Sequence, residues 1–114
     1  MDIKDRAFEF SVDMVQLCQT LHASAPQLLP RMTDTLLLAG TNIAAHVEEA
    51  HGSGKADFIA HMQAAAQSAR QVHYWLRLLQ ATRPVPNTPL PPLIDEAQQL
   101  AAILSSIVKT AKKG

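Results

Sequence analysis

Residues 58–79, FIAHMQAAAQSARQVHYWLRLL, determine the fold class of this 114-residue chain. Their apolar side chains recur in alternating steps of four and three residues, at Phe58, Met62, Ala65, Ala69, Val72, Leu76 and Leu79. This spacing places every member on one face of an α-helix, whereas a β-strand would alternate with period two. The stretch therefore predicts a long amphipathic helix that packs nearly parallel to its neighbours.

Three other segments carry the same spacing. Their apolar positions are Ile3, Ala7, Phe10, Met14, Leu17 and Leu21 in the first, Met32, Leu36, Ala39, Ile43, Val47 and Ala50 in the second, and Leu93, Ala97, Leu100, Leu104, Ile107 and Ala111 in the last. We therefore expect helices at about 4–22, 30–51, 54–82 and 92–112. Short connections make consecutive helices antiparallel neighbours, so the predicted fold is all-α, an antiparallel up-down four-helix bundle.

Proline and glycine set the predicted helix boundaries. Pro30 suits the first position of a helix, where the missing amide hydrogen is not needed. Gly52-Ser53-Gly54 predicts a tight hairpin loop in which Ser53 caps the third helix. Residues 83–92 hold five of the seven prolines, so we expect a stiff, extended connection there, with Pro92 at the start of the last helix.

The share of charged residues is low for a helical protein. Asp, Glu, Lys and Arg make up 18% of the chain, against about 25% in an average domain, and 47% of the residues are hydrophobic. A monomeric bundle must cover the outside of each helix with polar groups. The shortage indicates that part of the outer surface of this single domain, residues 1–114, is covered by further copies, and we expect a homo-oligomer.

The sequence also indicates a cytoplasmic protein. A single cysteine, Cys18, excludes an internal disulfide and fits a reducing compartment. The first six residues are too charged for the start of a signal peptide. No apolar run approaches the ~20 residues that span a bilayer.

Several apolar residues lie outside the four apolar stripes, and we expect them to form the contact between subunits. They are Phe8, Val12, Val15, Leu37, Tyr74, Trp75 and Leu78. Clustered aromatic and aliphatic side chains on a surface usually mark an interface, and Trp and Tyr are frequent anchors there. The alternative is that these residues widen the core of the bundle itself.

Catalytic and metal-binding patterns are weak, and we expect neither an enzyme nor a cofactor. Glu48 and His51 have the Glu-x-x-His spacing of di-metal bundles, but such sites need a second copy of that motif and further glutamates. A metal site built from His46, Glu49, His51 and His61 is therefore the least favoured hypothesis. The alternative is that His46 and His61, at similar distances from the hairpin loop, hydrogen-bond each other or a carboxylate.

Basic residues suggest a second function. Arg70 and Arg77 on the third helix, with Lys109, Lys112 and Lys113 at the end of the fourth, could contact nucleic acid. The formal net charge of zero argues against strong binding by one subunit. Lysines at a helix C-terminus also complement the helix dipole, which is their commoner role.

The second and third helices resemble a known bacterial group, the four helix bundle proteins. This group includes proteins encoded in intervening sequences of large-subunit ribosomal RNA genes, and the accessory variability determinants of diversity-generating retroelements are relatives. The similarity rests on Asn42-Ile43-Ala44, on Lys55, Asp57 and Phe58-Ile59 after a polar turn, on Ala65 and Ser68, and on the close Leu76, Leu78 and Leu79.

The resemblance implies an up-down bundle that forms a cyclic homo-oligomer, a pentamer in known cases, without enzymatic activity. It also implies a role in binding nucleic acid or a partner that processes it. Thr33 and Asp34 stand where family members often carry a basic pair, and the basic turn is reduced to residues 52–55. We therefore expect a non-enzymatic scaffold or interaction protein, with a nucleic-acid-binding accessory protein as the alternative.

Overall fold

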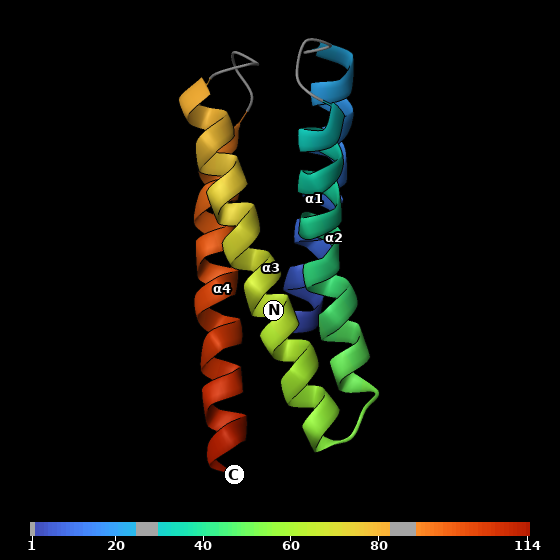
Figure 1. Cartoon of the computed structure of the whole chain (residues 1–114), viewed down its shortest axis with the longest axis vertical. Helices are drawn as coiled ribbons and strands as arrows, with labels where there is room; N and C mark the ends of the chain where they lie inside the picture. The colour runs from blue at the N-terminus through green and yellow to red at the C-terminus, as the bar shows by residue number, and fades with distance from the viewer. Residues whose placement is uncertain (1, 25–29, 83–88) are drawn as a thin grey trace.

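Four helices make up the computed structural model, which describes residues 2–24, 30–82 and 89–114. They are α1 (Ile3–Ser24), α2 (Pro30–His51), α3 (Lys55–Thr82) and α4 (Leu90–Lys113). Each runs antiparallel to the one before it, and the molecule measures 48 × 23 × 20 Å (Figure 1). The predicted all-α, up-down arrangement of four helices is confirmed. None of the described helices combines the length and apolar character needed to cross a membrane.

The helices pack around the bundle in chain order. α2 lies against α1 on one side and α3 on the other, and α3 packs equally closely on α4, whereas α1 makes only a thin contact with α4. Figure 1 shows the result as two helical hairpins, with α1 behind α2 on one side and α4 beside α3 on the other. Within the described residues the backbones of α1 and α3 are not in contact, so these helices occupy diagonal corners and meet only through core side chains.

The predicted apolar stripes form the core. Phe10, Met14, Ile43, Leu76 and Leu100 are each at most 1% exposed. The stripe residues near the ends of the helices are only partly buried, because fewer neighbouring turns cover them; they include Ile3, Met32, Phe58, Leu93 and Ile107.

Two predicted boundaries need correction. The Ser53 hydroxyl donates to the carbonyl of Ala50 at 3.0 Å, so it serves the C-terminal end of α2 instead of capping α3. Gly54 takes the position before α3, and its carbonyl accepts the amide hydrogen of Phe58 at 2.8 Å.

The last helix begins at Leu90, two residues before the predicted Pro92. Pro91 and Pro92 fit inside its first turn because the amides of that turn have no partner within the helix. Pro30 does begin α2, as predicted. The rest of the expected proline-rich connection, residues 83–88, lies outside the described residues.

A bidentate ion pair between Arg6 and Glu96 reinforces the thin contact between α1 and α4. Arg6 donates from Nε and Nη2 to the two carboxylate oxygens of Glu96, at 2.7 and 2.8 Å, and from Nη2 to Gln99 at 2.6 Å. Hydrogen bonding to Glu96 raises the pKa of Arg6. The two partners are 90 residues apart in the chain, and the sequence patterns gave no sign of this pair.

Gly40 lets α1 approach α2 closely. A Cβ atom at this position would lie 2.8 Å from Cγ and 3.0 Å from Cβ of Met14. The contact explains why α2 tolerates a glycine in its interior, where it costs about 1 kcal/mol relative to alanine. The close approach of another helix to Gly40 is thus made inside the bundle.

Gly40→Ala should destabilise the fold by about 1–3 kcal/mol, because overpacking against Met14 outweighs the better helix propensity of alanine. In a Met14→Ala background the same change should cost less, because the 2.8 Å contact with Cγ is removed and only the 3.0 Å contact with Cβ remains. Urea unfolding at one fixed protein concentration measures both values. Ala45→Gly, at an exposed site of α2, controls for propensity alone, and equal effects of Gly40→Ala in both backgrounds would contradict the prediction.

Candidate functional site

An apolar stripe runs along the outside of α1. Phe8 is 57% exposed, Val12 42% and Val15 38%, and their spacing of four and three residues puts them on one face. The inner face of the helix is already occupied by buried residues such as Phe10 and Met14. We call residues Asp5, Phe8, Val12 and Val15, spaced by three, four and three, the α1 outer stripe; the exposed Glu9 borders it.

The interface residues predicted on α2 and α3 divide into two groups. Leu37 and Trp75 are half-buried and pack against the core. For these two residues the structure agrees in part with the alternative given above, that they extend the core of the bundle. Leu78 is also only half-exposed. Tyr74, by contrast, is 51% exposed, with its ring edge-to-face on Trp75 at a centroid distance of 5.3 Å.

Sequence reasoning did not assign Leu38 to the contact surface, yet it is the most exposed large apolar residue described, at 63%. It stands on α2 without an exposed apolar neighbour one turn away. A lone exposed leucine is ordinary on a protein surface, so Leu38 is not a candidate by itself.

Arg70 and Arg77 flank Tyr74 on the outside of α3. All three are exposed, and with Gln67 they are spaced by three, four and three residues, so they share one face. We call Gln67, Arg70, Tyr74 and Arg77 the α3 outer stripe. The α3 outer stripe has the same residue spacing as the α1 outer stripe. Its charged residues are basic, whereas the α1 outer stripe has apolar residues at its centre and acidic residues at its edge.

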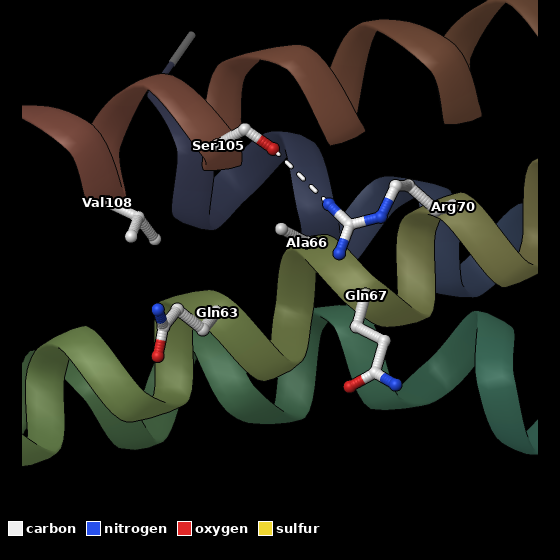
Figure 2. Close-up of a pocket in the computed structure, with 6 residues that line it drawn as sticks. All are labelled: Gln63, Ala66, Gln67, Arg70, Ser105 and Val108. Carbon is white, nitrogen blue, oxygen red and sulfur yellow. Dashed lines mark hydrogen bonds between the residues drawn. The ribbon is translucent and has the colours of Figure 1, made fainter.

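A shallow depression lies beside Arg70, where α3 meets α4. Figure 2 shows the guanidinium group of Arg70 turned toward Ser105 of α4, with the amides of Gln63 and Gln67 along the same helix. Arg70 Nη1 donates to Ser105 Oγ at 3.4 Å, a long and exposed bond. The exposed Lys109 follows Ser105 by one helical turn, and Lys112 and Lys113 end the helix, so α4 extends this basic surface.

The net charge of zero conceals a division between the two hairpins. Residues 1–51 contain seven Asp or Glu and three Lys or Arg, a formal charge of −4, while residues 52–114 contain three and seven, a formal charge of +4. The formal charge of each half was readable from the sequence, but the whole-chain balance of zero hid it. This separation puts opposite charge on opposite sides of the bundle.

The four residues of the metal hypothesis do not come together. His46 and His61 meet, with Nδ1 atoms 3.2 Å apart and ring centroids 5.4 Å apart, so one ring donates to the other as the hairpin register predicted. His51 instead donates from Nδ1 to the carbonyl of Val47 at 2.8 Å and lies edge-on to Phe58. In residues 2–24, 30–82 and 89–114 no three His, Cys, Asp or Glu side chains are placed to hold a metal ion.

Cys18 lies on the flank of α1 that faces α2. Its side chain is buried, and its Sγ is 3.9 Å from the carbonyl oxygen of Thr33. Burial raises the pKa of the Cys18 thiol to about 11, and the negative charge of Asp34 adds to the shift. A protonated thiol is a poor nucleophile, which agrees with a packing role.

Comparison with known proteins identifies a family and similar solved structures. The sequence model of the 23S rRNA-intervening sequence protein family matches residues 1–106. A crystal structure of a protein of unknown function from the S23 ribosomal protein family of Bacteroides thetaiotaomicron VPI-5482 is similar over 94% of this chain and 95% of that one, with 30% sequence identity and a TM-score of 0.82. No curated protein matches the chain.

Cys18 should react with an aromatic disulfide reagent at pH 8 about 100-fold more slowly in the folded protein than in urea, because so little thiolate is present. The rate should rise steadily as the pH approaches the raised pKa of about 11. Absorbance of the released thiol measures both. Equal rates in folded and unfolded protein would show that the side chain is accessible and ionised.

Proposed function

This chain belongs to the 23S rRNA-intervening sequence protein family, and from that premise we propose that it acts as a non-enzymatic scaffold that assembles into a cyclic homo-oligomer, a pentamer. The partner in this assembly is the protein itself. The proposal rests chiefly on one observation, the exposed apolar side chains of the α1 outer stripe.

The exposure of this stripe has a free-energy cost that assembly would remove. Fully burying a Val or Phe side chain contributes about 1.5–3 kcal/mol, and Phe8, Val12 and Val15 are each only partly covered in one subunit. The bundle cannot bury them by itself, because the opposite face of α1 already packs on the core. A second surface must cover them, and clustered residues of this kind usually mark such a contact.

The small share of charge supports the same proposal. Only 18% of the residues are charged, and two of these, Arg6 and Glu96, pair with each other between α1 and α4. A scaffold needs a rigid subunit, and the packed core and close α1–α2 contact at Gly40 provide one.

Light scattering after gel filtration should give a mass that is a multiple of 12.4 kDa, five-fold for the pentamer. Replacing Phe8 and Val12 together by Asp should reduce it to the mass of one subunit with unchanged helical circular dichroism, since charge at the contact cannot be buried unpaired. Leu38→Asp, at an exposed leucine off the stripe, is the matched control and should leave the assembly intact. A wild-type protein that remains at 12.4 kDa at micromolar concentration would overturn the proposal.

A second function, binding of nucleic acid, is favoured by the basic surface of α3 and α4. Arg70, Arg77 and the three C-terminal lysines are exposed on the half of the chain that carries +4. A few basic residues per subunit bind weakly, but a ring presents several copies to one nucleic acid, which raises the overall affinity. The name of the family refers to 23S rRNA, and structured RNA is therefore the first ligand to test.

Gel-shift titrations with structured RNA over a series of salt concentrations should show binding that weakens as salt rises. Replacing Lys109 and Lys112 by Ala, at exposed sites on α4, should weaken binding several-fold and lower the salt dependence by about two in slope. Replacing Lys4 and Arg31 by Ala removes the same charge from exposed sites on α1 and α2, and this control should bind like the wild type. If the protein does not retard structured RNA even at low salt, this function is excluded.

A further inference from the structure

We infer that the α1 outer stripe of one copy docks on the α3 outer stripe of a second copy, so that subunits join head to tail through opposite charges around an apolar centre. The inference rests on the proposed self-assembly and adds which two surfaces meet. It names the partner as a second copy of this chain, and charge complementarity is the main argument.

The two stripes match in spacing. Both place four residues at steps of three, four and three along a helix, which gives each a straight ridge of side chains on one face. Ridges of this spacing allow two helices to pack side by side at a small crossing angle. The apolar members Phe8, Val12 and Val15 would then lie along the exposed ring of Tyr74 and the aliphatic stems of the arginines beside it.

The two stripes also match in charge. Asp5 and Glu9 border the apolar residues of α1, and Arg70 and Arg77 flank Tyr74 on α3; all four are exposed. Arginine forms forked hydrogen bonds with carboxylates and is frequent in protein interfaces together with tyrosine. The 3.4 Å bond from Arg70 to Ser105 is a weak competitor for such a partner.

The charges of the hairpins disfavour the two alternative pairings. Placing α1 on α1 of another copy would bring Asp5 and Glu9 near their own duplicates, on hairpins that each carry a formal −4. Placing α3 on α3 would bring arginines together on halves that each carry +4. Like charges across an interface exclude wrong pairings, so the acidic surface should select the basic one.

Because α1 and α3 lie at different corners of the bundle, the proposed contact between α1 of one copy and α3 of the next can repeat along a series of copies. The two helices are at diagonal corners of the bundle, so their outer faces point away from each other and one partner cannot cover both at once. Each docking event therefore leaves one free stripe at either end of the pair. A head-to-tail contact of this kind closes into a ring when the rotation between copies permits it.

Two charge-reversal variants test the pairing. The first carries Asp5→Lys and Glu9→Lys, and the second carries Arg70→Glu and Arg77→Glu. Each alone should repel its own copies and raise the dissociation constant of the assembly at least ten-fold at low salt, measured by light scattering. Mixed in equal amounts, the two should form hetero-oligomers that contain both, because α1 of each variant is opposite in charge to α3 of the other. Favourable contacts then require the variants to alternate, so the mixture should give pairs or even-numbered assemblies and no closed pentamer.

Matched controls separate local from global charge effects. Asp34→Lys with Glu49→Lys makes the same charge change on α2, and Lys109→Glu with Lys112→Glu makes the second change on α4; both should assemble like the wild type. Circular dichroism checks that every variant is folded.

The outcomes distinguish the two proposals. A wild-type oligomer that neither reversal variant weakens, or that the controls weaken equally, overturns the pairing of α1 with α3 but keeps the scaffold. Variants that dissociate but do not reassemble when mixed also overturn the pairing. A wild type that stays monomeric overturns the proposed assembly and this inference with it.

Discussion

Each helix of this bundle can turn only one face toward the core, and most of the molecule's properties depend on that limit. The inner face of α1 is filled by Phe10 and Met14, which leave no room for the apolar residues on its outer side. Phe8 therefore remains 57% exposed although phenylalanine is among the residues most often buried. The spacing of four and three that builds the core is repeated on the outside of α1.

α1 packs closely on α2 but makes only a thin contact with α4. This difference determines which face of α1 is exposed. Because Gly40 has no side chain, α2 lies close to α1, and the Met14 side chain occupies the space that a Cβ atom at position 40 would need. The contact with α4 is thin and is joined by the ion pair between Arg6 and Glu96, and in the described residues the backbones of α1 and α3 are not in contact. The side of α1 turned away from the core is thus left open at a corner of the bundle.

Charge contributes little to the stability of one subunit, and its role in our proposal is to select which surfaces meet. The exposed acidic and basic residues are divided between the two hairpins, so few can pair within one subunit, and exposed pairs would contribute little in any case. In the assembly that we propose, separated charge of opposite sign orients two copies and speeds their association. Such an effect weakens with salt, because the Debye length is only about 10 Å at 0.1 M.

The sequence by itself determined the number of helices and their apolar faces, and it placed His46 and His61 near each other, because these follow from local periodicity and from the register set by a short hairpin loop. It left open whether the two rings bond each other or a carboxylate. It also contained the charge division between the halves, which the total charge conceals. Only the tertiary structure decided that Trp75 is half-covered while Tyr74 is exposed, and that Arg6 reaches Glu96. Those facts depend on where neighbouring helices lie relative to each side chain, and residues 90 positions apart carry no local pattern that reveals it.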